Sequence, residues 1–298
     1  MATSKNLLPL SVATLGIACF AAMDGVMKSL AIDLGAYNAM LWRTPISIAF
    51  SALLFFALRL AWPTPAALRL HVLRGVLVTL MGFMFFWGLI YVPLAEAVAL
   101  SFIAPLIALY LAAALLKEAI GLTALFASLL GFTGALIIVF GQLSGEFGSD
   151  IAYGIAAILC SAVMYAYNLI LQRQQALLAK PAEIALFQNS TSCIVLLCAA
   201  PWLAHVPDTE HAPLIVLAAL LSTGALMILA WAYARAEAKV LIPVEYTAFV
   251  WASLLGWWFF SEQLTRSTLI GTALIVTACL LASRQAPARA DHLETTAL

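Results

Sequence analysis

The feature that most constrains the fold of this 298-residue chain is an internal repeat with an offset of 144 residues. From Asp24 to Leu136 the first half aligns with the second half without a gap, and Trp87 falls on Trp231. Glu118 likewise falls on Glu262. Each half contains five hydrophobic segments, and an odd number of membrane crossings turns the second copy upside down relative to the first. Inverted repeats of this kind are common in secondary transporters.

The composition of the chain requires a membrane. Charged residues make up 9% of the sequence and hydrophobic residues 65%, with a mean hydropathy of +1.06, whereas soluble domains carry about 25% charged residues. A helix of about 20 apolar residues spans the ~30 Å hydrocarbon core of a bilayer. We therefore predict an all-α integral membrane protein whose ten transmembrane helices form two five-helix, inverted-topology repeats around a central cavity. The predicted spans are residues 7–30, 37–58, 72–91, 95–116, 121–140, 151–172, 183–204, 213–235, 240–260 and 267–283.

The repeat also defines the domain organisation. We predict a first repeat over residues 1–143, a second, inverted repeat over 144–283, and a flexible cytoplasmic tail over 284–298. On the side of the N-terminus the loops hold eleven lysines and arginines, and the opposite side holds only Arg266. This positive-inside bias predicts that both termini are cytoplasmic.

Prolines and glycines inside the spans indicate special helix geometry. Pro45, Pro105 and Pro243 lie within the second, fourth and ninth spans. Breaks of this kind are tolerated where neighbouring helices or a water-filled cavity satisfy the freed backbone groups. They indicate that these three helices line an interior path, with simple packing kinks as the alternative. Gly131 and Gly134 indicate a close contact between the fifth span and another helix.

Ionisable side chains at membrane depth are costly and mark functional pathways by default. Asp24 and Lys28 are four residues apart on one face of the first span, where they can pair. Their repeat partners, Asn168 and Gln172, keep the polarity without the charge. One interpretation is a neutralised pair that only orients the first helix. The other is that Asp24 or Lys28 faces the cavity and meets a charged group of the substrate.

Three further polar positions are candidates for the pathway. Arg43 in the second span either snorkels outward or offers a forked donor to a carboxylate, and Gln188 lies one position from its repeat counterpart. Glu245 in the ninth span lies next to Tyr246. It either snorkels toward the cytoplasm or binds an ammonium group or a proton.

Aromatic side chains are the remaining candidates. Trp87 and Tyr91 lie on the third span and Trp231 on the eighth. Aromatic belts at the membrane interface explain many such residues. Because Trp87 and Trp231 are related by the repeat, inversion places one near each mouth of the path, where they suit gates or stacking surfaces for a flat substrate.

The sequence carries no enzymatic or cofactor fingerprint. The five cysteines lack metal-ligand spacing, and we predict no catalytic residue, no metal and no cofactor. All four histidines lie outside the predicted spans, which disfavours a buried histidine proton relay. The basic residues near the start of the third span are predicted to face anionic lipid headgroups in a cytoplasmic loop and not nucleic acid. They are Arg59, Arg69, His71 and Arg74.

The residues also resemble a known family. The stretch from Leu73 to Glu118, the segments AAMDGVMKSL and LWRTP, and the closing FSEQLTRSTLIGTALIVTA resemble the ten-helix EamA-type members of the drug/metabolite transporter superfamily. The resemblance covers essentially the whole chain. It implies helices one to four and six to nine around a central cavity, with helices five and ten at the periphery. The second half departs from the pattern, since Phe249 stands where Pro105 would repeat, which leaves the kinking of the ninth helix open.

The resemblance implies an inner-membrane exporter of small metabolites that works by alternating access, and the chain looks most like bacterial exporters of amino acids, including aromatic ones. The expected partners are a small-molecule substrate and the bilayer. The oligomeric state stays open, with a monomer as the simplest expectation. Export of cationic or aromatic drugs is the alternative, and a lipid flippase or a non-transporting membrane scaffold is the alternative from another class.

Overall fold

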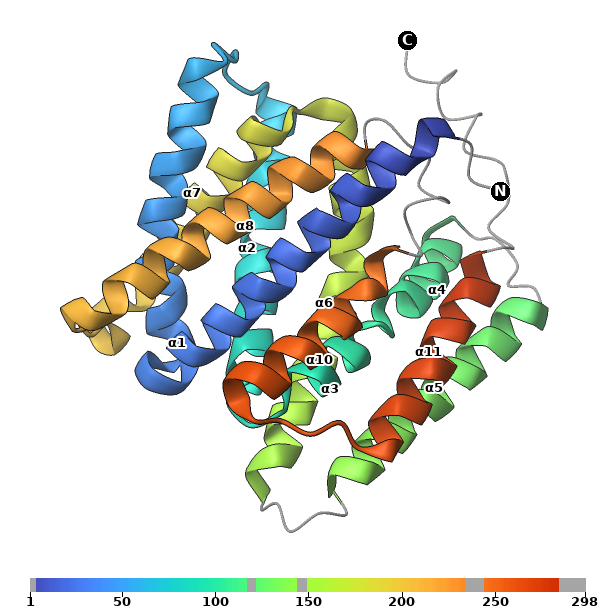
Figure 1. Cartoon of the computed structure of the whole chain (residues 1–298). Helices are drawn as coiled ribbons and strands as arrows, with labels where there is room; N and C mark the ends of the chain where they lie inside the picture. The colour runs from blue at the N-terminus through green and yellow to red at the C-terminus, as the bar shows by residue number, and fades with distance from the viewer. Residues whose placement is uncertain (1–3, 117–121, 144–148, 234–243, 284–298) are drawn as a thin grey trace.

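The computed structural model of the chain describes residues 4–116, 122–143, 149–233 and 244–283, and all regular structure in these ranges is helical (Figure 1). The helices are α1 (Ser4–Ala57), α2 (Pro65–Gly88), α3 (Leu94–Ser101), α4 (Ala104–Leu116), α5 (Leu122–Leu143), α6 (Ser149–Leu178), α7 (Pro181–Leu203), the short 3₁₀ turn η1 (Thr209–His211), α8 (Ala212–Tyr233), α10 (Thr247–Phe260) and α11 (Arg266–Ser283). Among the described residues, five helices are long and apolar enough to cross a membrane, and several shorter apolar helices accompany them. Glu118, the predicted tail and most of the segment between the predicted repeats lie outside the described residues.

Helix α1 is a hairpin of two legs. Its 54 residues would extend about 80 Å as one straight helix, far more than a bilayer requires. Gly35 divides the first leg, residues 4–34, from the second leg, residues 36–57, because it adopts φ 78° and ψ 149°. Glycine reaches this left-handed region without steric cost. Figure 1 shows the first leg crossing the molecule and the second leg turning away from it. The turn between the first two predicted spans is therefore shorter than the sequence suggests.

The prolines inside the predicted spans behave differently from one another. Pro45 lies inside the second leg of α1 without breaking it. A helical proline leaves the carbonyl four residues earlier without its usual donor, and here the Thr44 hydroxyl donates to that Leu41 carbonyl at 2.9 Å. The local sequence thus satisfies the group that Pro45 frees.

The fourth predicted span is broken just before Pro105. Helix α3 ends at Ser101 and α4 begins at Ala104, as expected because Pro105 has no N–H to donate to the Ser101 carbonyl four residues earlier. The thiol of Cys279 on α11 donates to the Phe102 carbonyl in this break at 3.2 Å. Pro243 lies outside the described residues.

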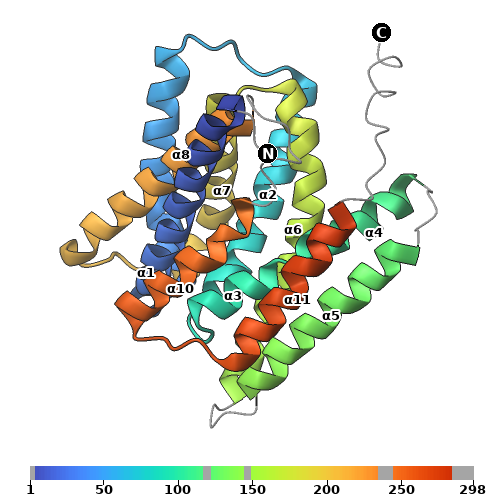
Figure 2. The same ribbon diagram turned by 45° about the vertical axis from the view of Figure 1, so that its right-hand side comes forward.

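Helices α5 and α11 form an antiparallel pair at one side of the molecule (Figure 2). Their backbones approach closely through glycines: a Cβ built on Gly134 would lie 2.6 Å from the Gly271 carbonyl oxygen. Gly131 likewise faces Ala278. Small residues allow such approaches in membranes, where packing and not the hydrophobic effect joins helices. The close contact predicted for the fifth span is confirmed.

The remaining helices form the larger group. The two legs of α1 pack against α8 and α7, and α2 packs against α6 and α7. Helices α2 and α6 run antiparallel, because the end of α2 at Gly88 contacts the start of α6 at Gly154. A cluster of buried residues from most of these helices forms the core.

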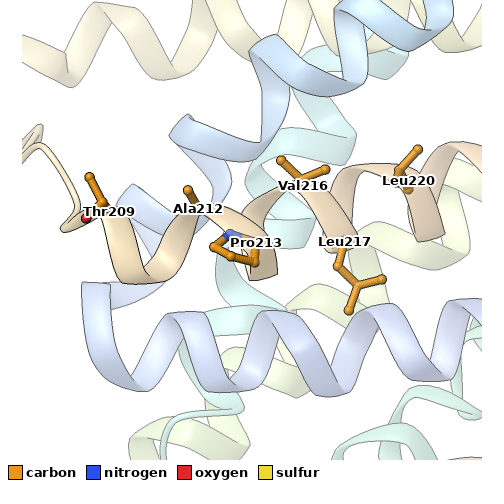
Figure 3. A pocket seen from close by; sticks show the side chains of 6 residues that line it. All are labelled: Thr209, Ala212, Pro213, Val216, Leu217 and Leu220. Carbon is orange, nitrogen blue, oxygen red and sulfur yellow. The ribbon is translucent and has the colours of Figure 1, made fainter.

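The outward face of α8 is apolar and exposed. Figure 3 shows a shallow pocket on this face whose lining is almost entirely aliphatic. The lining residues are Thr209, Ala212, Pro213, Val216, Leu217 and Leu220. A stripe of exposed aliphatic side chains on a membrane helix suits contact with lipid chains, so the pocket does not belong to the polar interior described below.

The glycine contact of α5 with α11 yields a stability prediction. Replacing Gly134 by alanine places a methyl group against the α11 backbone, and we expect a loss of about 1–3 kcal/mol of unfolding free energy. Thermal unfolding in detergent measures it. The matched control is Gly224→Ala in α8, where a Cβ meets nothing within 4 Å; equal melting temperatures for the two variants would contradict the close contact.

Candidate functional site

A buried ion pair joins the first leg of α1 to the segment between α10 and α11. The Lys28 ammonium donates to Glu262 Oε1 at 2.5 Å and to the Val92 carbonyl at 2.8 Å. The other oxygen of Glu262 accepts from the Leu94 backbone N–H at 2.8 Å. Only 6% of the Lys28 side chain and 14% of the Glu262 side chain are exposed. Lys28 is therefore paired with Glu262, and the expected alternative of a pair with Asp24 is wrong.

A second buried carboxylate lies beside this pair. Glu96, in the first turn of α3, accepts from the Thr268 hydroxyl at 2.8 Å and from the Gln142 amide at 3.1 Å. All three side chains are buried. We call Lys28, Glu262, Glu96, Gln142 and Thr268 the Lys28 network. It ties α1, α3, α5 and α11 together at the end of the bundle where α1 turns.

A separate polar chain joins α2, α6 and α7. Arg74 Nε donates to Asn168 Oδ1 at 2.8 Å, and Arg74 Nη1 donates to Gln175 Oε1. The Gln175 amide contacts His71 Nδ1 at 2.5 Å, and His71 Nε2 contacts Glu183 Oε1 at 3.1 Å. These five residues, the His71 network, are all buried.

The position of this network corrects two expectations. Arg74 and His71 were expected in a loop that faces lipid headgroups, but both side chains are buried, with His71 0% exposed. Arg59 and Arg69 are exposed. The expectation that all four histidines lie outside the membrane spans is wrong for His71, because α2 begins at Pro65, earlier than the third predicted span, and carries His71 inward.

The two networks lie at opposite ends of the bundle. His71 and Arg74 lie on the first turns of α2, whereas Val92 and Leu94 follow its last residue. The helical residues from Arg74 to Gly88 alone rise about 20 Å. A zone between the ends is therefore bounded by a buried polar network on either side.

Two opposite charges lie in this zone on the two legs of α1. Asp24 on the first leg and Arg43 on the second leg are the strongest charged neighbours of each other. Both side chains are half-buried. The Arg43 guanidinium reaches Met23 Sδ at 4.0 Å on the first leg, so it points into the bundle and the alternative of outward snorkelling is wrong.

Several buried polar atoms in the interior have no hydrogen-bond partner among the described residues. The Nε atom of Arg43 and the Oε1 atom of Gln188 on α7 are such atoms. Ser47 Oγ, Thr223 Oγ1 and Trp251 Nε1 are further examples, on α1, α8 and α10. A buried polar group that stays unbonded costs roughly 1–3 kcal/mol, so atoms of this kind call for a water molecule or a ligand.

Glu245 and Tyr246 directly precede α10. Glu245 interacts electrostatically with Tyr165 on α6, which also senses Asp24 and Arg74. Tyr246 packs edge-on against Phe102, with ring centroids 5.2 Å apart. Tyr165 is therefore within electrostatic range of both Asp24 and Glu245.

The predicted aromatic candidates lie apart from this set. Trp87 packs edge-on against Tyr91 at 5.2 Å near the end of α2, and Tyr91 is exposed. Trp231 lies near the other end of the bundle, against Ala13 and Ile17 on the first leg of α1. The two tryptophans do not meet.

Sequence reasoning missed the partners that complete both networks. Glu262 stood out only as a repeat match, and Glu183 and Gln175 were not considered. One signal was present: Gln175 follows Asn168 by seven residues, which is two turns on one helix face. No group of three or more potential metal-ligating side chains occurs among the described residues.

The Lys28–Glu262 pair yields a second prediction. Lys28→Met leaves a buried carboxylate without its partner, and we expect a loss of about 3–5 kcal/mol of stability in detergent unfolding. The Lys28→Met, Glu262→Met double variant should lose less than the sum of the single changes. The exposed Lys180→Met is the control and should change stability by less than about 0.5 kcal/mol. If Lys28→Met behaves like the control, the ion pair does not hold the two elements together.

Comparison with known proteins places this geometry in a family. The sequence profile of the EamA-like transporter family matches the chain twice, over residues 7–140 and 152–284. The chain is 28% identical to a riboflavin transporter of Brucella anthropi over 72% of this chain and 76% of the relative. It is 26% identical to the pseudopaline exporter CntI of Pseudomonas aeruginosa over 89% of this chain and 92% of the relative.

Two further similarities agree with these matches. An S-adenosylmethionine uptake transporter of Rickettsia felis is 27% identical, with 70% of each chain covered. A solved crystal structure superimposes with a TM-score of 0.61 at 19% identity, over 99% of this chain and 100% of that chain. At this identity the superposition shows the fold alone.

Apolar membrane helices enclose a polar interior, and the family profile matches the chain twice. Both observations indicate a transporter rather than an enzyme. This multi-pass membrane protein belongs to the EamA-like transporter family.

Proposed function

We propose that the protein is a secondary transporter of the bacterial inner membrane that exports small metabolites by alternating access. One observation carries the proposal: a zone with two opposite charges and unpartnered polar atoms lies between polar networks at opposite ends of the bundle. A carrier needs a binding site near the bilayer midplane. It also needs an element at each end that closes in turn.

We further propose ten spans in two inverted repeats, residues 1–143 and 144–283. The double profile match supports this division. Phe102 and Tyr246 are 144 residues apart, both lie at helix breaks, and their rings meet. Under the same shift of 144 residues, Gly131 corresponds to Ile275 and Gly134 corresponds to Ala278. The Gly131–Ala278 contact therefore corresponds to the Gly134–Ile275 contact, as a two-fold axis between the halves requires.

The distribution of basic residues supports cytoplasmic termini. In that orientation the His71 network lies at the cytoplasmic end and the Lys28 network at the outer end. An exporter loads its substrate through the first end and releases it through the second.

We propose amino acids, including aromatic ones, as the substrates. Asp24 and Arg43 offer opposite charges to the ammonium and carboxylate of a zwitterion. Gln188 supplies a further unpartnered carbonyl oxygen on α7. Tyr246 and Glu245 line the opposite side, and Trp87, Tyr91 and Trp231 would serve the entrances rather than the binding site. Lys28 would help to close the outer end of the bundle through the Lys28 network instead of binding the substrate. The family relatives are named for three different small metabolites, and their names support a small-molecule substrate of some kind.

A second candidate is export of aromatic cations. Glu245 supports it, because this half-buried carboxylate adjoins two aromatic side chains, Tyr165 and Tyr246. Aromatic faces and a carboxylate together attract a desolvated cation.

The test is flux through the purified protein in liposomes. Labelled tryptophan, phenylalanine, threonine and a planar dication are each measured with and without a pH gradient. We expect saturable tryptophan or phenylalanine flux that falls roughly ten- to a hundred-fold in Arg43→Gln and Asp24→Asn, since a charged hydrogen bond is worth about 1.5–3 kcal/mol.

The matched control is Arg69→Gln, which removes an exposed arginine and should leave flux unchanged. Dication flux that survives Arg43→Gln but is lost in Glu245→Gln would replace the amino-acid proposal by the drug-export candidate. If none of the four probes crosses the membrane, the transport proposal fails, whether or not labelled lipids flip between the leaflets.

A further inference from the structure

The His71 network has a fixed direction of hydrogen bonding. The Arg74 guanidinium can only donate, so the atom of Gln175 that faces it must be the carbonyl oxygen, as the contact of Nη1 with Oε1 has it. The two ends of an amide group point in different directions. The NH₂ group of Gln175 must therefore face His71, where the separation from Nδ1 is 2.5 Å.

This direction determines which ring nitrogen of His71 carries the proton. Since the Gln175 NH₂ donates, Nδ1 must accept and cannot hold a proton. A neutral imidazole then has its proton on Nε2, which donates to Glu183 Oε1 at 3.1 Å. Arg74 thus sets the tautomer of His71 through Gln175. The closed chain contains one positive and one negative end and is neutral overall.

We propose that His71 is a proton-binding latch that couples opening of this end of the bundle to pH. A proton that binds to Nδ1 turns the acceptor into a donor and opposes the Gln175 NH₂ group. Rotation of the Gln175 amide only transfers the conflict, because its NH₂ group would then face Arg74. Protonation must break one of the two bonds of Gln175. The link to substrate movement rests on the proposed transport function.

The bonds of Arg74 show which part would move. Arg74 Nε keeps its bond to Asn168, so this point of α6 stays attached to α2. Gln175 lies two turns beyond it, near the end of α6 at Leu178. Loss of one Gln175 bond weakens the attachment of the segment 171–178 to α2, while His71 and Glu183 keep α2 attached to α7.

The charged surroundings of His71 are few. Glu183 faces it from α7 and Arg74 acts from α2, with Tyr165 of α6 beside Arg74. From α1, the contact at this corner is aromatic: Phe55 packs against Phe187, which stacks on the His71 ring at 5.5 Å. On α1 the charges Asp24 and Arg43 interact with each other. Histidine is the side chain whose charge ordinarily changes between pH 5 and 8, and Nδ1 of His71 is the ring atom that would take up the proton.

The first experiment determines which ring nitrogen of neutral His71 carries the proton. Protein labelled with ¹⁵N-histidine is studied by NMR, and the His71 signals are assigned by their loss in His71→Gln. We expect the neutral form with the proton on Nε2 at pH 8. A neutral form with the proton on Nδ1, or a ring that is charged at pH 8, would overturn the proposal.

The second experiment reads the latch by hydrogen–deuterium exchange at pH 5.5 and 7.5, corrected for intrinsic exchange rates. On acidification we expect exchange in residues 171–178 to rise on the order of ten-fold, as loss of a buried hydrogen bond predicts. Gln175→Glu is isosteric and offers an acceptor to both Arg74 and a charged His71. It should therefore abolish the acid-induced rise.

The control is His205→Gln, which changes an exposed histidine whose contacts to α1 use its backbone atoms. It should keep the wild-type response. An acid-induced rise that persists in both His71→Gln and Gln175→Glu would overturn the latch. Neither readout uses substrate, so absence of flux in liposomes would remove the transport proposal while these results still decide whether the latch exists.

Discussion

The constraint on which the structure depends is that a charge inside an apolar bundle must be paired. Lys28 meets this requirement by bonding Glu262 and a backbone carbonyl, and Arg74 meets it by bonding two amide side chains. Each solution joins elements that are far apart in the sequence, so satisfying the charge also fixes the ends of helices. Because removing one member of such a set costs several kcal/mol, each network can hold its end of the bundle closed. Rearranging the partners can open it.

Between the two networks the same requirement is met only in part. Asp24 and Arg43 are near each other, yet Arg43 Nε and, one turn further along the same leg, Ser47 Oγ have no hydrogen-bond partner among the described residues. Structural networks leave few such atoms, whereas binding sites contain them because the ligand supplies the missing bonds. The contrast between complete networks at the ends and incomplete bonding between them is the physical basis for proposing a substrate site there.

The sequence predicted those features that depend on local chemistry. The glycine contacts of the fifth span are confirmed, and Pro105 marks a helix break. Pro45 does not break α1, because whether a proline interrupts a helix depends on a neighbour such as Thr44 that can satisfy the freed carbonyl. His71 and Arg74 were misplaced because positive charge near a helix start predicts a loop on average. Their burial depends on Gln175 and Glu183, which lie about a hundred residues away along the chain, and a single sequence gives no sign of such a pairing. The predicted pathway residues remain a proposal.

The most direct test of the central claim asks from which side the zone between the networks can be reached. Ser47 is 0% exposed and is replaced by cysteine after the five native cysteines are changed to alanine. A membrane-impermeant thiol reagent is then applied to either side of oriented vesicles. We expect that Lys28→Met increases labelling from the side of the Lys28 network alone and that Arg74→Met increases it from the opposite side alone. Equal labelling from both sides in every variant, or none in any, would contradict it.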